Sequence, residues 1–185
     1  RVTTASKQYL NQDCFVVDHW IKTGINIQYD EPRAVGSDRL CDAAAVMHLY
    51  GGPACVVDFG TATTFNAITK EGEYLGGAIT PGINISAEAL FSRTAKLPRV
   101  ELAAPPAVIG RNTVHSMQSG LLFGYVGLVE GMVARFKAEL GPQTKVIGRG
   151  GLAALYPAHG AGLDERERPP LELVAVVTGK LARAV

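Results

Sequence analysis

The pattern of hydrophobic and polar residues predicts three consecutive strands in the middle of the chain. Residues 54–60, ACVVDFG, form a short apolar and β-branched run bounded by glycine and proline, which is typical of a buried strand. Residues 63–69, TTFNAIT, alternate in character, and residues 73–80, EYLGGAIT, follow the charged, glycine-containing turn KEGE. Connections as short as these predict a β-meander.

Residues at helical spacing lie on both sides of this meander. The alanine-rich segment LCDAAAVMHLY predicts a helix from about Arg39 to Leu49, which the following YGGP would end. The polar, turn-rich residues 23–39 before it are expected to form a loop. Two further helices are expected over residues 81–97 and 112–140, with an irregular connection between them.

The two ends of the chain carry weaker signals. Residues 6–12 are helical in character and residues 14–20 resemble a strand. Residues 145–151 predict another strand, residues 152–158 the start of a helix, and residues 171–185 a last helix or strand–helix unit. Because the chain opens on helix-like residues without a methionine, we expect an N-terminal portion to precede it. A short protein trimmed by processing is the alternative.

Four glycines recur every three or four residues in the longest predicted helix. They are Gly120, Gly124, Gly127 and Gly131, and this spacing places them on one side of the helix. A glycine inside a helix costs about 1 kcal/mol relative to alanine, so the stripe predicts the close approach of another backbone, most simply a second helix. Pairing of membrane helices is the alternative, which the charged residues in the second half of the segment oppose.

Composition and charge narrow the classes of function. The chain has 47% hydrophobic and 19% charged residues, as an ordinary soluble domain does. A formal net charge of +1 gives no electrostatic reason to expect a nucleic-acid partner. No apolar run approaches the roughly 20 residues that span a bilayer, so no membrane partner is expected. Cys14, Cys41 and Cys55 lack zinc-like spacing and are expected to be free thiols in a reducing cytoplasm.

Asp58 ends the first predicted strand, and Gly60 and Thr61 follow it. A carboxylate at a strand end, a glycine that allows close backbone approach and a threonine hydroxyl together form a candidate phosphate and cation site. A plain β-hairpin in which Asp58 hydrogen-bonds the turn explains the same residues. The letters Asp-Phe-Gly also occur in protein kinases, but no His-Arg-Asp loop precedes them here and the chain is too short for a protein kinase.

Two helix starts carry further candidate residues. Asp38 either caps the helix that follows, which is worth roughly 1 kcal/mol, or acts as a general base for a substrate hydroxyl. In the second case Arg39 would face an anionic group. At the start of the long helix, Thr113 is a candidate polar contact, and a capping role for Asn112 or Thr113 is the alternative.

Taken in order, four stretches of the chain resemble the type III pantothenate kinase family. They are NIQYDEPRAVGSDR, HLYGGPACVVDFGTATTFNAI, GEYLGGAITPGINISAEALFSRTAKLPRVEL and VIGRNTVHSMQSGLLFGYVGLVEGMV. The resemblance implies an α/β protein of the actin-like ATPase (ribonuclease H-like) fold, with a β-meander plus helices, and usually a homodimer. It also implies ATP-dependent phosphorylation of pantothenate to 4'-phosphopantothenate, the first step of coenzyme A biosynthesis.

The resemblance implies roles for the residues around the GSDR motif. Asp38 would take the proton from the primary hydroxyl of pantothenate, and Gly36, Ser37, Asp38 and Arg39 would line the pantothenate site. Thr113 would contact the substrate as well. Such roles suit phosphoryl transfer, which needs an oriented nucleophile and compensation of charge more than covalent help.

The resemblance also implies the cofactors of the reaction. Asp58 would bind a monovalent cation, K⁺ or NH₄⁺, and Thr61 would contact ATP. ATP with Mg²⁺ is expected as the phosphoryl donor.

The chain departs from the family pattern near both ends. Nothing in it resembles the Asp-x-Gly-Asn-Thr phosphate motif with which the family begins. Residues 1–35 are therefore interpreted as a remnant of the N-terminal actin-like domain with its linker, and residues 36–185 as the C-terminal actin-like domain. Arg149 stands where the family has a threonine near the nucleotide cleft, and residues 172–185 match the family's closing helix poorly.

Two other hypotheses stay open at this point. The chain could be a non-catalytic homologue or fragment that acts as a binding or regulatory protein. It could also be another actin-like sugar or acetate kinase, a hypothesis that the order of the four motifs weakens.

Overall fold

A five-stranded mixed sheet forms the centre of the chain, in the order β1-β4-β3-β2-β5. The computed structural model describes residues 2–14, 16–17 and 20–150. The strands are β1 (Asn26–Ile27), β2 (Ala54–Phe59), β3 (Ala62–Ile68), β4 (Glu73–Pro81) and β5 (Lys145–Arg149). The antiparallel pairs β2–β3 and β3–β4 confirm the predicted meander, and β5 adds to β2 in parallel.

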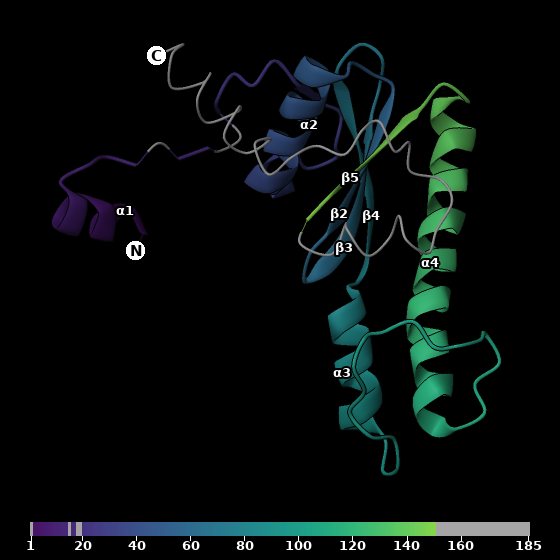
Figure 1. Cartoon of the computed structure of the whole chain (residues 1–185). Coiled ribbons are helices and arrows are strands. Elements are labelled where there is room, and N and C mark those ends of the chain that lie inside the picture. Colours follow the sequence, from purple (N-terminus) through teal and green to yellow (C-terminus); the bar gives the residue numbers. More distant parts are fainter. Residues whose placement is uncertain (1, 15, 18–19, 151–185) are drawn as a thin grey trace.

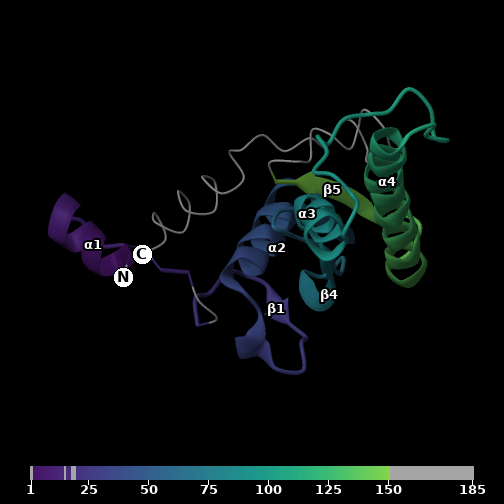
Figure 2. The same cartoon turned by 90° about the horizontal axis from the view of Figure 1, so that it is seen from below.

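The helices are α1 (Val2–Ala5), α2 (Ser37–Leu49), α3 (Ile83–Arg93) and α4 (Thr113–Leu140), with a π-helical turn at Ser6–Leu10 and a 3-10 turn at Pro32–Ala34. Of these, α2 and α4 cover the two faces of the sheet (Figure 1). The three helices predicted around the meander are thereby confirmed, although α3 ends earlier than the sequence pattern indicated. In both Figure 1 and Figure 2, α1 lies apart from the sheet.

Two predictions about the first part of the chain are wrong. Residues 14–20 were expected to form a strand, yet the described residues among them, 14, 16, 17 and 20, belong to no strand. Conversely, β1 lies inside the predicted loop of residues 23–39 and pairs in parallel with β4. β1 is only two residues long, which is too short to leave an alternating hydrophobic pattern in the sequence. The elements predicted over residues 152–158 and 171–185 lie outside the described residues.

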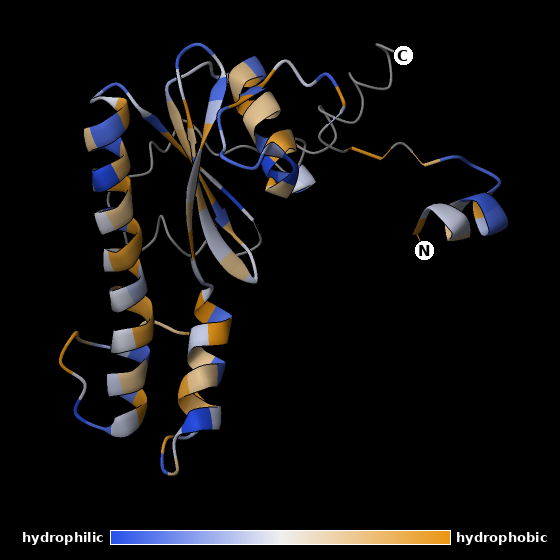
Figure 3. Cartoon of the chain, turned by 180° about the vertical axis from the view of Figure 1, so that it is seen from behind, coloured by the Kyte–Doolittle hydropathy of each residue, from blue (hydrophilic) through white to orange (hydrophobic). Residues whose placement is uncertain are grey.

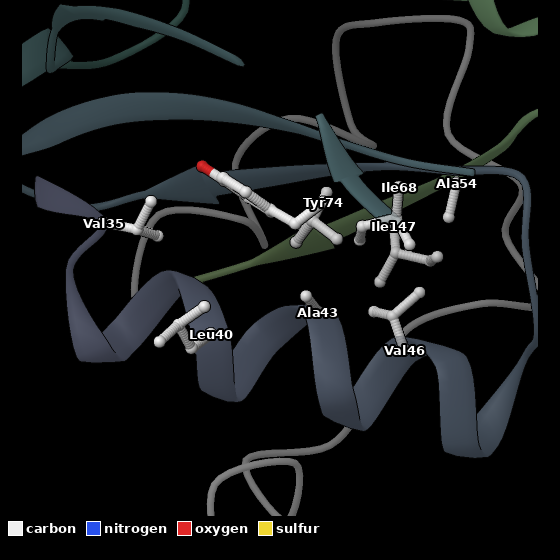
Figure 4. Packing of buried hydrophobic residues seen from close by; sticks show 9 residues of the cluster. Val35, Leu40, Ala43, Val46, Ala54, Ile68, Tyr74 and Ile147 are labelled. Carbon is white, nitrogen blue, oxygen red and sulfur yellow. The ribbon is translucent and has the colours of Figure 1, made fainter. Parts of the chain in front are cut away.

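The alternation of side chains along β2 divides the core into two halves. Ala54 and Val56 face α2, whereas Cys55 and Val57 face α4, because successive side chains of a strand point to opposite sides. Figure 4 shows the α2 half, where side chains of the helix meet those of the sheet; its buried members are Val35, Leu40, Ala43, Val46, Ala54, Val56, Ile68, Tyr74 and Ile147. The sheet is therefore covered on both faces, and polar residues at its strand ends are the places where chemistry can occur.

The long helix α4 is the crossover that lets β5 return parallel to β2. Its residues Val126, Val129 and Val133 are buried against the sheet, and Figure 3 shows hydrophobic residues gathered on the side that faces it. By length and composition alone, α4 is also apolar enough to cross a membrane. The core helix of a soluble protein meets the same criteria, and the buried valines show that one side of α4 packs against the sheet.

The glycine stripe of α4 does not pack against another backbone in the described part of the chain. A Cβ atom added at Gly120, Gly124 or Gly127 would meet no atom within 4 Å, and one at Gly131 would meet only the end of the Arg135 side chain. The second helix that the sequence predicted is therefore not found among the described residues.

Candidate active site

Three carboxylates of the α2 face converge at the carboxyl end of β2. Asp58 lies two residues beyond Val56, so the period of the strand turns its side chain toward α2. Asp38 and Asp42 are four residues apart on α2 and therefore share one face of that helix. Asp42 and Asp58 experience the charges of one another and of Asp38, so the three carboxylates form one acidic cluster.

The guanidinium group of Arg149 lies between two of these carboxylates. Arg149 is the last residue of β5 and the Cα partner of Asp58 in the parallel ladder. One terminal nitrogen of its guanidinium donates to Oδ1 of Asp42, and its Nε lies 3.3 Å from Oδ1 of Asp58. The pairing of Asp58 with Arg149 in the β2–β5 ladder thus places the guanidinium of Arg149 inside the acidic cluster.

Burial dominates the electrostatics of this cluster. Burial raises the pKa of Asp42 to about 7, and the opposing effect of the Arg149 guanidinium does not cancel it. Burial likewise raises the pKa of Asp58, again against the influence of Arg149. The nearby carboxylates in turn raise the pKa of Arg149 despite its own desolvation, so the guanidinium stays charged.

Asp38 differs from its two neighbours because its side chain is exposed in the first turn of α2. Gly36, not Asp38, is the N-cap residue, so the capping interpretation of Asp38 is wrong. An added Cβ at Gly36 would lie 2.4 Å from Oδ1 of Asp38, which shows how closely the carboxylate lies against this glycine. Among the described residues, no hydrogen bond or ion pair engages Asp38, and its carboxylate is therefore available to a ligand.

A polar network on the sheet lies behind the start of α2. The buried Tyr74 hydroxyl donates to Oδ1 of Asn66 at 3.0 Å, and the amide of Asn66 donates to Oγ1 of Thr64 at 3.1 Å. Burial raises the pKa of Tyr74, and the nearby Arg39 guanidinium opposes this shift. Arg39 thus follows Asp38 in the sequence and lies close to the hydroxyl of Tyr74, so it connects the start of α2 to this polar network.

Thr61 lies in the tight connection between β2 and β3, where its carbonyl accepts a hydrogen bond from the N–H of Gly82 at 3.1 Å. Gly82 is the N-cap residue of α3, and an added Cβ there would lie 2.4 Å from the carbonyl oxygen of Thr61 and 2.5 Å from that of Gly60. Only glycine therefore lets the two backbones come this close. The contact fixes the exposed Thr61 beside the amino end of α3, where an N-terminal helix dipole favours anions.

Thr113 lies far from this group of residues. It is the first residue of α4 and is exposed, and Asn112 caps the helix by accepting the N–H of His115 at 2.8 Å. The hydroxyl of Tyr125, further along α4, hydrogen-bonds Thr63 of β3. Twelve residues of helix separate Thr113 from Tyr125, or about 18 Å at a rise of 1.5 Å per residue. Thr113 and Asp38 of one chain are therefore not brought together.

Sequence reasoning missed Asp42 and the pairing of Arg149. Asp42 is 2% exposed in the middle of an alanine-rich helix, and its spacing of four from Asp38 was the available signal. Arg149 was singled out as a departure from the family pattern, but its contact with Asp42 and Asp58 depends on the pairing of β5 with β2. Nothing in the local sequence encodes that pairing.

Comparison with known proteins gives this arrangement a family. The family model for type III pantothenate kinase matches residues 1–135, which is well over half of the chain. The chain belongs to the type III pantothenate kinase family. Both Asp38 and Asp58 lie inside the matched residues, whereas Arg149 lies beyond them.

Curated relatives support the same family. A type III pantothenate kinase from Moorella thermoacetica is 53% identical over 154 residues, which are 83% of this chain and 61% of the relative. One from Geobacillus sp. strain WCH70 is 54% identical over 157 residues, or 85% of this chain and 61% of the relative. The chain thus spans about 61% of the length of these relatives.

A solved structure shares the fold of this family member. It is a crystal structure from Campylobacter jejuni, named for the Baf family of transcriptional activators. The two chains superpose with a TM-score of 0.60 at 18% identity, over 98% of this chain and 78% of the other. At this identity the similarity concerns the fold alone.

Proposed function

We propose that the full-length protein phosphorylates pantothenate to 4'-phosphopantothenate with ATP, the first step of coenzyme A biosynthesis. The observation that carries the proposal is the carboxylate of Asp38, which is exposed and without a partner among the described residues of a type III pantothenate kinase family member. A general base must be free to accept a proton from the attacking hydroxyl, and its neighbours must leave room for substrate.

In this proposal, Asp38 accepts the proton of the primary hydroxyl as the phosphoryl group is transferred. Gly36 supports the role because any side chain there would displace the carboxylate of Asp38. Ser37 and Arg39 complete the lining of the pantothenate site, with Arg39 facing the carboxylate of pantothenate. A guanidinium can bind a carboxylate through two parallel hydrogen bonds, which makes it suited to this task.

We further propose that ATP binds beside Thr61, where the amino end of α3 can receive phosphate oxygens. Mg²⁺ would be held mainly by the ATP phosphates, since magnesium sites of kinases use only one or two carboxylates in addition to substrate. The described residues contain no group of three or more His, Cys, Asp or Glu side chains that could hold a metal by themselves.

A homodimer of the actin-like ATPase fold, located in the cytoplasm, is the assembly that we propose. The glycine stripe of α4 supports the homodimer, because it leaves open space that a second copy of the helix could occupy. Thr113 precedes Gly120 and Gly127 by two and four helical turns, so it lies on the same side of α4. A second copy could therefore bring its Thr113 to a substrate that the first copy's Asp38 activates. The three free cysteines support a reducing compartment.

Replacing Asp38 by Asn in the full-length protein tests the proposal. Asn cannot accept the proton, so ADP release in a coupled assay with pantothenate is expected to fall by a factor of about 10² or more, the usual contribution of a general base. Glu71→Gln, at an exposed position of the β3–β4 turn, is the matched control and should keep wild-type turnover. Near wild-type turnover of Asp38→Asn would remove Asp38 from the reaction.

A further inference from the structure

The positive charge inside the acidic cluster comes from the chain itself. Arg149 is held between Asp42, whose side chain is 3% exposed, and Asp58, whose side chain is 16% exposed. Its own side chain is 24% exposed, so all three groups are largely withdrawn from water. At such a position an unpaired, ionised carboxylate is costly, so it either takes up a proton or is paired with an opposite charge, and Arg149 supplies that charge here.

We infer that the guanidinium of Arg149 takes the place of a monovalent cation at Asp58, so that the full-length protein works without K⁺ or NH₄⁺. The inference rests on the proposed function. It replaces the sequence-based expectation that Asp58 binds such an ion, and it names the residue that does so instead.

The residues around Asp58 do not fit a bound cation. Hard cations require several oxygen atoms at once. Oδ1 of Asp58 instead lies 3.3 Å from Nε of Arg149, a nitrogen donor that would repel a cation. The backbone of Gly150 approaches the same oxygen, since an added Cβ there would lie 2.9 Å from it. With a φ of +100°, Gly150 adopts a conformation that favours glycine and permits this approach.

The guanidinium can fill the role of the ion because its charge is permanent. Arginine does not lose its proton in proteins, and its planar group can serve two carboxylates at the same time. Asp38 contributes a further negative charge to the field at Arg149. The positive charge beside Asp58 is therefore present at every physiological pH and at any potassium concentration.

Thermal unfolding of the full-length protein in equal concentrations of KCl or choline chloride tests the inference without reference to activity. The wild-type midpoint is expected to be the same in the two salts. Arg149→Thr removes the charge and exposes Oδ1 of Asp58, so its midpoint should fall in choline chloride and rise again with KCl. Arg149→Lys keeps the charge, so its unfolding midpoint should be the same in KCl and in choline chloride.

A matched control separates this effect from the loss of any arginine. Arg99 pairs with Glu88 at 3.1 Å on the surface, and Arg99→Thr should show no preference for KCl. In a pantothenate-dependent assay, Arg149→Thr should turn over at least about tenfold faster in KCl than in choline chloride, and wild type should not. The inference is overturned by a wild-type midpoint that rises saturably with KCl, or by an Arg149→Thr variant that responds no more than wild type. If the protein shows no kinase activity, the unfolding data still decide this point.

Discussion

Asp42 is a buried acid in the middle of a helix, and its burial has a measurable consequence for stability. The side chain accepts a hydrogen bond from Arg149 and lies on the same face of α2 as the exposed Asp38, four residues earlier. Burial raises its pKa from the ordinary 3.8 to about 7. In the pH range between these values, the folded protein holds a proton that the unfolded chain has released.

Asp42 therefore makes the free energy of unfolding fall as pH rises from about 4 to about 7. The slope from one such group is at most roughly 1.4 kcal/mol per pH unit. We expect Asp42→Asn to flatten the pH dependence, as measured by urea denaturation at about pH 5 and about pH 8. The exposed Asp13→Asn should keep the wild-type slope. An unchanged slope in Asp42→Asn would assign the pH dependence to other groups.

At the residue scale, the sequence offered candidate residues but not the partners among them. Asp38 stood out as a carboxylate at a helix start and Thr61 as a hydroxyl after a glycine at a strand end, whereas a role for Gly36 came only from the resemblance to the family; turn and capping roles explain the same residue types, so their binding and catalytic roles stay predictions. The sequence could not separate a capping role of Asp38 from a catalytic one, because the start of α2 decides between them and the observed N-cap, Gly36, lies two residues before Asp38. The pairing of Arg149 with Asp42 and Asp58 joins residues about a hundred positions apart and depends on tertiary structure.

At the scale of elements, the meander and its three surrounding helices could be predicted because their hydrophobic periods are long and unambiguous. β2 is the exception, since it was predicted from a continuous apolar run bounded by glycine and proline; both of its faces are covered, with Val56 and Asp58 toward α2 and Val57 and Phe59 toward α4. The two-residue strand β1 could not be predicted, because a pair of residues has no period. The prediction of a strand over residues 14–20 was wrong for a different reason: the apolar pattern is present, but the described residues offer no strand for it to pair with.

The junction of the β2–β3 turn with α3 gives a prediction at this scale. Gly82→Ala would bring a methyl group within 2.5 Å of two backbone carbonyl oxygens, and backbone cannot move aside as a side chain can. We expect destabilisation of roughly 1–3 kcal/mol, as for other overpacked sites, measured by chemical denaturation. Ser92→Ala, at an exposed position of the same helix, should be neutral or slightly stabilising. Equal stability of the two variants would show that the turn and α3 separate easily.

At the scale of the whole molecule, α4 carries both Thr113, a proposed substrate contact, and the glycine stripe at which we propose that a second copy binds. Its core face packs against the sheet, and its glycine stripe points away from it. In one chain Thr113 lies far from Asp38, so the substrate contact that we propose for Thr113 would come from the second copy of the proposed homodimer. The sequence predicted that another backbone would approach the stripe. It could not tell a helix of the same chain from one of a partner.

The oligomeric state tests this arrangement. Gly124→Leu places a large side chain in the open stripe, where it has no neighbour in a single chain but would block a second helix. We expect the variant to be a monomer by light scattering coupled to gel filtration and to keep its helical circular dichroism, because leucine favours helix. Glu139→Leu, on the same helix but outside the stripe, should remain a dimer. A dimeric Gly124→Leu would exclude the stripe as the interface.

The central claim concerns the substrate of the full-length protein, and product analysis tests it most directly. The protein is incubated with ATP, Mg²⁺ and pantothenate, or with a pantothenate analogue that lacks the primary hydroxyl, and the products are identified by mass spectrometry. We expect 4'-phosphopantothenate with pantothenate, and neither a phosphorylated product nor ADP above background with the analogue. Pantothenate recovered unchanged from a folded, ATP-supplied protein would contradict the claim and favour a binding or regulatory role.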